Sequence, residues 1–103
     1  MKKYNVTFMK AAYDDLDKIF DFILLDNPKA AKHMLDTIMK QLGRLEEFPL
    51  LGKPLYNKHL NYYRFRMVII NPYIVFYRFI DDTVYIYRIL HGATNYIDIL
   101  KGW

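Results

Sequence analysis

Residues 62–90 read YYRFRMVIINPYIVFYRFIDDTVYIYRIL, and this stretch decides the predicted fold. It is rich in aromatic and β-branched residues, which are enriched in strands because they pack well on a pleated surface. Two turn signals, Asn71-Pro72 and Asp81-Asp82, divide it. The predicted strands are Tyr62–Ile69, Tyr73–Ile80 and Thr83–Leu90. Because connections this short join antiparallel neighbours, the segment predicts a three-stranded antiparallel meander.

The residues before the meander change their apolar period from two to about 3.6 residues. Lys3–Met9 alternates as a short strand, and apolar stripes at helical spacing then run from Ala11 to Leu24 and from Ala31 to Leu45. Asn27-Pro28 separates the stripes. Asparagine is a favoured N-cap, and proline fits the first helical position because its missing N–H would be unpaired there. These features predict two helices in a tight hairpin.

The remaining segments complete a single predicted domain over residues 1–103. Pro49–Asn61 has no clear period and predicts a loop, and Asn95–Lys101 is long enough only for a terminal helical turn or two. At 103 residues and 12.5 kDa the chain has room for one hydrophobic core. The predicted fold is α+β, a two-layer arrangement of an N-terminal strand, a helical hairpin and the meander.

Composition excludes several classes of protein. With 53% hydrophobic and 25% charged residues, the chain has the make-up of a globular protein. It has no cysteine, which excludes disulfides, thiolate metal sites and a cysteine nucleophile. The longest uncharged run, Met67–Tyr77, has 11 residues, whereas a membrane span needs about 20. No apolar stretch of signal-peptide length follows Lys2 and Lys3, so we expect a cytoplasmic protein.

The net charge of +4 lies entirely in the second half of the chain. Up to Phe48, eight basic residues cancel eight acidic ones, whereas from Pro49 onward there are seven basic and three acidic residues. Four of the five arginines and seven of the ten tyrosines lie between Tyr62 and Tyr96. Arginine suits bidentate phosphate contacts and aromatic rings accept stacked bases. This half therefore predicts either an anionic partner or an exposed sheet face for which these residues are suited.

Strand alternation gives a testable pairing. If both turns hold two residues, Ile80 lies opposite Thr83 and Ile69 opposite Pro72. One open face then carries Arg64, Arg66, Arg88 and Tyr77. The other face, suited to pack on the helices, carries Phe65, Met67, Ile74, Phe76 and Ile89, and also Arg78, which needs a partner or a route to solvent. A three-residue turn at Asn71-Pro72 would invert the first strand.

Three arginines on one face repel each other unless an anion is bound, which predicts a phosphate site or an acidic partner. The alternative is that each arginine reaches solvent or pairs with Asp or Glu. The sequence has no glycine-rich phosphate loop, nucleophile elbow or metal-ligand spacing, so we expect neither metal nor cofactor. His91 ends a predicted strand, where a histidine is either catalytic or a hydrogen-bonded edge residue.

Four short motifs, in their order along the chain, resemble the RelE/ParE toxin superfamily. They are Gly52-Lys53-Pro54-Leu55, Tyr63-Arg64-Phe65-Arg66, Tyr73-Ile74-Val75-Phe76-Tyr77-Arg78 and Arg88-Ile89-Leu90-His91-Gly92-Ala93. The resemblance covers essentially the whole chain. It implies a bacterial toxin of a type II toxin–antitoxin module, with roles in growth arrest and plasmid stabilisation.

The superfamily implies two different activities. RelE-like members cleave mRNA in the ribosomal A site without metal, whereas ParE-like members poison DNA gyrase and are not known as nucleases. Leu90-His91-Gly92-Ala93 is closer to the ParE side, although Thr94 and Asn95 replace the arginine and aspartate that follow there. We therefore favour gyrase poisoning, with ribosome-dependent mRNA cleavage as the alternative. The chain is an enzyme only in the second case.

The resemblance also supplies candidate site residues. Arg64 and Arg66 match two basic positions of RelE-like toxins, but the family's next arginine falls at Ile74, and Thr94 marks a further departure. The candidates for catalysis are Arg64, Arg66 and Arg88 for charge stabilisation, and His91 or Tyr96 for proton transfer. The implied partners are a cognate antitoxin and either gyrase or the ribosome with its mRNA. A homodimer and a toxin–antitoxin hetero-oligomer both remain open, and we also keep a degenerate module that only binds its antitoxin.

Overall fold

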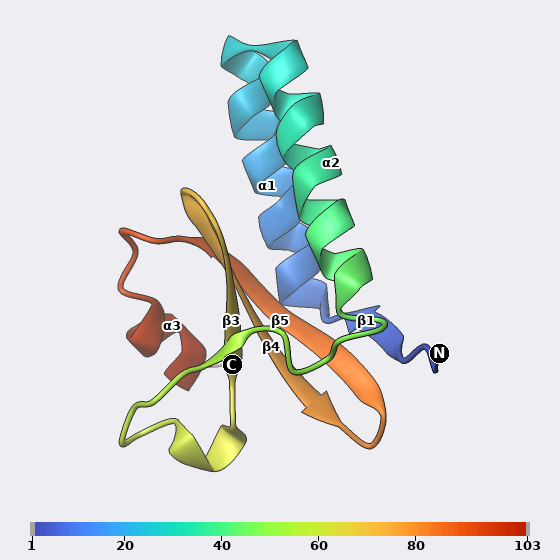
Figure 1. Ribbon diagram of the computed structural model, residues 1–103. Helices are drawn as coiled ribbons and strands as arrows, with labels where there is room; N and C mark the ends of the chain where they lie inside the picture. Colours follow the sequence, from blue (N-terminus) through green and yellow to red (C-terminus); the bar gives the residue numbers. More distant parts are fainter. Residues whose placement is uncertain (1, 103) are drawn as a thin grey trace.

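The computed structural model describes residues 2–102 and is drawn in Figure 1. In chain order its elements are β1 (Asn5–Phe8), α1 (Lys10–Asp26), α2 (Pro28–Arg44), β2 (Lys53–Pro54), the 3-10 turn η1 (Asn61–Tyr63), β3 (Arg66–Ile70), β4 (Tyr73–Ile80), β5 (Thr83–His91) and α3 (Tyr96–Lys101). The predicted order of a strand, a helical hairpin and a meander is confirmed. The first predicted meander strand is shorter than expected, because Asn61–Tyr63 forms η1.

The strands form one sheet in the order β1-β5-β4-β3-β2. The meander β3-β4-β5 is antiparallel, as predicted, and β1 joins its β5 edge in parallel. A parallel neighbour requires a crossover rather than a tight turn, and the helical hairpin α1–α2 begins that long connection. β2, which lies inside the predicted loop, covers part of the opposite edge by pairing with Met67 and Arg66.

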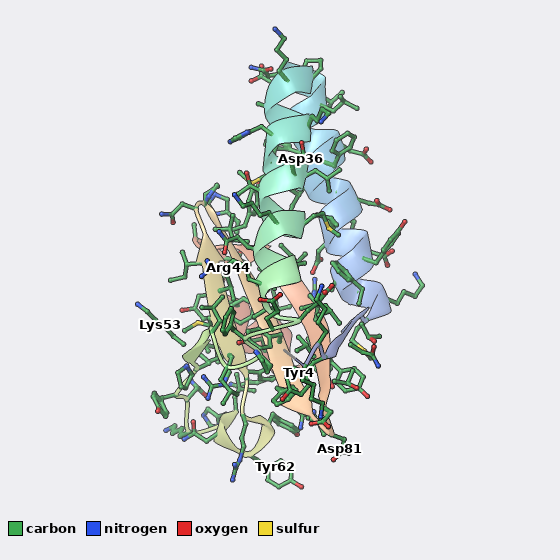
Figure 2. The ribbon with its side chains drawn as sticks, turned by 45° about the vertical axis from the view of Figure 1, so that its right-hand side comes forward. Tyr4, Asp36, Arg44, Lys53, Tyr62 and Asp81 are labelled. Atoms are coloured by element: carbon green, nitrogen blue, oxygen red, sulfur yellow. The ribbon has the colours of Figure 1, made fainter. Side chains whose placement is uncertain are left out.

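The helical hairpin packs on one face of the sheet, and its turn projects beyond the sheet (Figures 1 and 2). Asn27 ends α1 by donating its backbone N–H to the Ile23 carbonyl at 2.8 Å, and its Oδ1 accepts from the Ala30 N–H at 3.1 Å. Pro28 follows at the first position of α2. The predicted capping role of Asn27-Pro28 is confirmed. Within residues 2–102, none of the helices combines the length and apolarity that crossing a bilayer requires.

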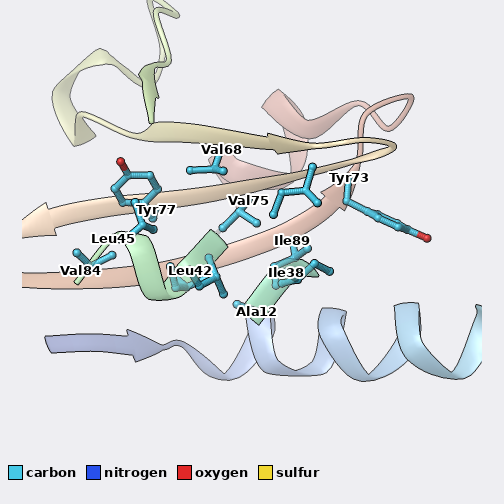
Figure 3. Packing of buried hydrophobic residues seen from close by; sticks show 12 residues of the cluster. Ala12, Ile38, Leu42, Leu45, Val68, Tyr73, Val75, Tyr77, Val84 and Ile89 are labelled. Atoms are coloured by element: carbon cyan, nitrogen blue, oxygen red, sulfur yellow. The ribbon is translucent and has the colours of Figure 1, made fainter. Parts of the chain in front are cut away.

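A first cluster of buried side chains fills the space between the helical hairpin and the sheet (Figure 3). Its members are Ala12, Ile38, Leu42, Leu45, Val68, Ile70, Tyr73, Val75, Tyr77, Val84, Ile86 and Ile89. α2 contributes the 3.6-period positions that the sequence singled out, and β4 contributes every second residue. This cluster holds the helices on the sheet.

A second cluster lies on the opposite face of the sheet. It contains Leu55, Leu60, Phe65, Phe76, Tyr87, Leu90 and Leu100. α3 covers this face, with Leu100 fully buried and the Tyr96 ring 5.0 Å from that of Phe76. Both faces of the sheet are thus apolar, and a short third layer supplements the two predicted layers.

The predicted register of β3 against β4 is wrong by two residues. Ile70 pairs with Tyr73, so the turn consists of Asn71 and Pro72, and Arg66 lies opposite Tyr77 rather than Val75. The reason is that Pro72 has no N–H to donate to a ladder partner, which favours its place in the turn. The second turn is as predicted, with Ile80 opposite Thr83.

A β-bulge in β5 also alters the predicted faces. The register shifts between Phe76 and Tyr77 of β4, which places Phe76 opposite Arg88. Bulges insert one residue and re-aim its side chain, and here both Arg88 and Ile89 reach the helical layer. Of the five residues predicted to pack on the helices, only Ile89 belongs to the first cluster. The others, Phe65, Met67, Ile74 and Phe76, are part of the second cluster or pack against it.

Replacing Gly43 with alanine should stabilise the chain. Gly43 lies inside α2, and a Cβ built there meets no heavy atom within 4 Å. Since glycine in a helix interior costs about 1 kcal/mol relative to alanine, we expect Gly43→Ala to raise the free energy of unfolding by about that amount. Urea denaturation of the purified chain measures the difference, and a decrease would show that this part of α2 requires glycine.

Candidate functional site

The five candidate residues are distributed over three parts of the chain and both faces of the sheet. Arg64 follows η1 and Arg66 begins β3, Arg88 and His91 lie on β5, and Tyr96 begins α3. Arg64 and Arg66 line a common pocket. The predicted open face with Arg64, Arg66, Arg88 and Tyr77 together does not form, because Tyr77 is buried in the first cluster.

Arg64 and Arg66 border an open pocket of about 400 Å³ between the η1 region and β2, which we call the Arg64 pocket. Its lining residues are Pro54, Leu55, Tyr56, Asn61, Arg64, Phe65 and Arg66. Arg64 is exposed and adopts a left-handed backbone conformation, with φ of 57° and ψ of 44°. Within residues 2–102 its guanidinium has no hydrogen bond or ion pair, so its charge is available to a ligand.

Arg66 has a structural contact as well as a place in the pocket. Its Nη1 donates to the carbonyl of Gly52 at 2.8 Å and to that of Leu50 at 3.3 Å. The two bonds attach the segment before β2 to β3. Arg66 can therefore add to the positive potential of the Arg64 pocket while it holds the loop in place.

Tyr77 also holds the segment before β2, through hydrogen bonds of its buried hydroxyl. Its hydroxyl donates to the Pro49 carbonyl and accepts from the Gly52 N–H, both at 2.8 Å. Burial raises the pKa of Tyr77, although the hydrogen bond from Gly52 and the charge of Arg66 oppose that shift. The tyrosine is therefore neutral at physiological pH. Its hydroxyl holds the loop through two hydrogen bonds and is not a proton-transfer group.

Gly52 is required by the close approach of the loop to Tyr77. A Cβ at residue 52 would lie 2.7 Å from Tyr77 Cε1 and 2.8 Å from the carbonyl oxygen of Met67. These separations are shorter than van der Waals contact, so no larger residue fits without moving the loop. The glycine of the Gly52-Lys53-Pro54-Leu55 motif thus has a packing reason.

Arg88 is committed to Asp15 of α1. Its Nε donates to Asp15 Oδ2 at 2.7 Å and its Nη2 to Oδ1 at 2.8 Å, and the same carboxylate accepts from the Ile89 N–H at 3.0 Å. The hydrogen bond to Asp15 raises the pKa of Arg88, and burial opposes it. The sequence left open whether each arginine of the predicted open face binds an anion or pairs with an acidic side chain. Arg88 pairs with an acidic side chain.

His91 and Tyr96 lie outside the Arg64 pocket. His91 ends β5, where its Nδ1 accepts from the Ala93 N–H at 3.0 Å and its ring meets Tyr73 edge-on at 5.8 Å between centroids. Tyr96 packs on Phe76 as part of the second cluster's surroundings. Each has a structural partner where it lies, and their part in proton transfer remains a proposal.

Arg78 finds the partner that its predicted position demanded. Its Nε donates to the Tyr63 carbonyl at 2.6 Å and its Nη1 to the Tyr87 hydroxyl at 3.2 Å. The guanidinium also lies 5.7 Å from the ring centroids of both tyrosines, within the range of cation–π attraction. Arg78 thereby connects η1 to β5 on the second face of the sheet.

Sequence reasoning missed the residue that pairs with Arg88 and the contact that holds the loop before β2. Asp15 was one of several aspartates in an amphipathic helix, and only its place on the apolar stripe beside Leu16 and Ile19 set it apart. Tyr77 and Gly52 lie 25 residues apart, and no local pattern indicates that they touch. In residues 2–102, no group of three or more histidine or acidic side chains is arranged to hold a metal ion.

Comparison with protein families gives one match over most of the chain. The sequence model described as the ParE toxin of the type II toxin–antitoxin system parDE matches residues 6–96. By sequence, no curated protein matches the chain.

Two solved structures share the fold. A chain of the chromosomal ParDE TA system from P. aeruginosa has a TM-score of 0.70 and 20% identity, with 86% of this chain and 96% of that chain covered. A chain of the toxin–antitoxin complex RelBE2 from Mycobacterium tuberculosis has a TM-score of 0.61 and 27% identity, with 86% and 98% covered.

Gly52→Ala should destabilise the chain even though the change is small. Overpacking in a confined site costs about 1–3 kcal/mol, and here it would also displace the hydrogen bond to Tyr77. Urea unfolding gives the magnitude, and Gly43→Ala is the matched control because the same methyl group enters open space there. Equal stability of the Gly52 variant and the wild type would refute the steric role.

Removing the acid of the Asp15–Arg88 pair should be worse than removing both charges. Asp15→Ala leaves a guanidinium unpaired whose side chain is only 24% exposed, which we expect to cost about 3 kcal/mol. The double variant Asp15→Ala/Arg88→Met should recover part of that loss, because no uncompensated charge remains. Unfolding free energies measure both effects. A double variant less stable than Asp15→Ala would contradict this account.

Proposed function

The chain belongs to the ParE toxin family of type II toxin–antitoxin systems, and on that basis we propose that it arrests bacterial growth by binding DNA gyrase. In this mechanism the toxin performs no chemistry of its own. The family membership makes the chain a toxin, and the choice of target is the proposal.

The commitment of Arg88 to Asp15 is the observation that supports a binding mechanism. Metal-free RNA cleavage needs a group to activate the 2′-hydroxyl and cations to stabilise the developing phosphorane, all at one phosphate. Arg88 directs two of its donors to the Asp15 carboxylate, which offsets its charge. His91 and Tyr96 lie outside the Arg64 pocket. These contacts leave Arg64 and Arg66 as the candidates that share a pocket.

RNA cleavage is the second candidate function, and the Arg64 pocket is what favours it. Arg64 and Arg66 match the basic positions of RelE-like toxins, and they line one concave surface that is open to solvent. Under this alternative the two arginines stabilise the phosphate, and Tyr96 or His91 moves the proton. The two candidate functions differ in what stops first in the cell.

A cognate antitoxin is the proposed regulating partner. One similar structure is described as a toxin–antitoxin complex, and the other belongs to a ParDE system. On this chain the projecting helical hairpin exposes apolar side chains, with Phe22 at 72% and Leu25 at 90% exposure. An amphipathic antitoxin segment laid on the hairpin would bury them. Because gyrase is the proposed target of the toxin, we propose that the toxin acts in the bacterial cytoplasm.

Pulse labelling in a bacterial host distinguishes the two functions. Minutes after induction we expect thymidine incorporation to fall before methionine incorporation, because poisoned gyrase breaks the chromosome. Coexpression of the neighbouring gene's product should prevent the fall. An immediate loss of methionine incorporation with thymidine spared would overturn the gyrase proposal in favour of mRNA cleavage.

A point variant is a better probe of this activity than a C-terminal truncation. Leu100 is fully buried in the second cluster and Tyr96 packs on Phe76, so removal of α3 would uncover this cluster and destabilise the chain whatever its activity. Arg64→Asn keeps these contacts, since the Arg64 side chain is exposed and asparagine tolerates the left-handed conformation.

A further inference from the structure

We infer that the Arg64 pocket binds a strand of DNA, with the Arg64 guanidinium on a backbone phosphate and the Tyr56 ring stacked on a base. The inference rests on the proposed function, because DNA gyrase is an enzyme that acts on DNA. It adds that the toxin touches the nucleic acid as well as the enzyme.

The charge distribution around the pocket favours a polyanion. Residues 48–80 contain no aspartate or glutamate, and their basic residues are Lys53, Lys58, Arg64, Arg66 and Arg78. The acids gather elsewhere, five of them on α1, which belongs to the projecting hairpin. A region with one sign of charge raises the local concentration of oppositely charged ligands. DNA carries one negative charge per phosphate, and it is the polyanion that a gyrase inhibitor meets at its proposed target.

Arg64 itself has the features of a ligand-binding residue. Its left-handed conformation costs a non-glycine residue about 1–2 kcal/mol. Among residues 2–102, no hydrogen bond or ion pair of the Arg64 side chain offsets this cost. Glycine or asparagine would adopt the same turn more favourably. Strain of this kind is characteristic of functional positions, and here it holds an unpaired guanidinium at the pocket.

Exposed aromatic rings suit nucleic acid better than an acidic protein segment. Tyr56 lines the pocket at 82% exposure, and Tyr62 extends into solvent from η1 at 88% (Figure 2). Proteins that bind single strands combine a positive groove with aromatic faces on which bases stack. An acidic peptide would use the arginines, but its carboxylates offer no flat surface on which the rings could stack.

The loop that carries these groups is braced before any ligand arrives. The Asn57 N–H donates to Asn61 Oδ1 at 2.8 Å, and Asn57 Oδ1 accepts from the His59 N–H at 2.9 Å. The side-chain oxygen of Asn61 therefore accepts a hydrogen bond within the loop, and its Nδ2 amide can donate to a ligand in the pocket. A preformed loop reduces the ordering cost of binding.

Fluorescence anisotropy with a labelled single-stranded DNA of about 12 nucleotides tests the site on the purified full chain. We expect the logarithm of the association constant to fall linearly with the logarithm of salt concentration, by about 0.7 for each phosphate neutralised. Arg64→Asn should reduce that slope by about 0.7 and weaken binding at low salt about tenfold. Tyr56→Ala should weaken it at least fivefold, which corresponds to about 1 kcal/mol of stacking.

Two exposed residues on the helical hairpin provide matched controls. Lys29→Gln removes the same unit of charge from α2, and Tyr13→Ala removes an exposed ring from α1. Both should leave DNA binding within about twofold of wild type, since surface changes away from the site act weakly. Urea denaturation verifies that all four variants are folded.

Three results would overturn the inference. They are absence of binding at low salt, equal loss of binding in Arg64→Asn and Lys29→Gln, and tighter binding of an RNA of the same sequence. The assay contains no gyrase, so its failure is separable from failure of the proposed function. A chain that inhibits purified gyrase but binds no DNA keeps the gyrase proposal and loses this site. A chain that binds DNA through Arg64 but first halts translation keeps the site and loses the gyrase proposal.

Discussion

The carboxylate of Asp15 joins the helical hairpin to the sheet, and much of the structure depends on that junction. It is the buried acid among residues 2–102, and it accepts three hydrogen bonds from two consecutive residues of β5. The junction is possible because the bulge directs both Arg88 and Ile89 to the helical layer. A charged pair and an apolar contact thus fix α1 at one point of the sheet. The first cluster fills the space around them.

The helical half of the fold was predictable because its signals are local. Asn27-Pro28 placed the turn between the helices, and the 3.6-residue period identified the side chains that reach the core. The sheet was less predictable because its pairing depends on distant residues. Strand alternation cannot reveal a one-residue bulge, which reversed the face expected for Phe76 relative to Ile89. One face of the sheet was predicted to be open, whereas both faces carry buried apolar side chains and α3 covers the second.

The candidate site was predictable only in part, for the same physical reason. Arg64 and Arg66 are close in sequence and therefore close in the pocket. Arg88 met an acid 73 residues away, and Tyr77 met a loop 25 residues before it, which no local pattern encodes. Both contacts draw polar groups into the body of the protein, where they hold elements together. The arginines and tyrosines of this chain are consequently divided between support and exposed surface.

The projecting hairpin sets a minimum length for an antitoxin segment that binds the hairpin and also covers the Arg64 pocket. The turn of the hairpin and η1, which borders the Arg64 pocket, lie toward opposite ends of the ribbon in Figure 1, and the longest dimension of the molecule is 39 Å. A segment that binds the hairpin and also covers the Arg64 pocket must span most of these 39 Å. This takes about 12 residues in extended form or about 26 in a continuous helix. A shorter antitoxin could hold the toxin without covering its pocket.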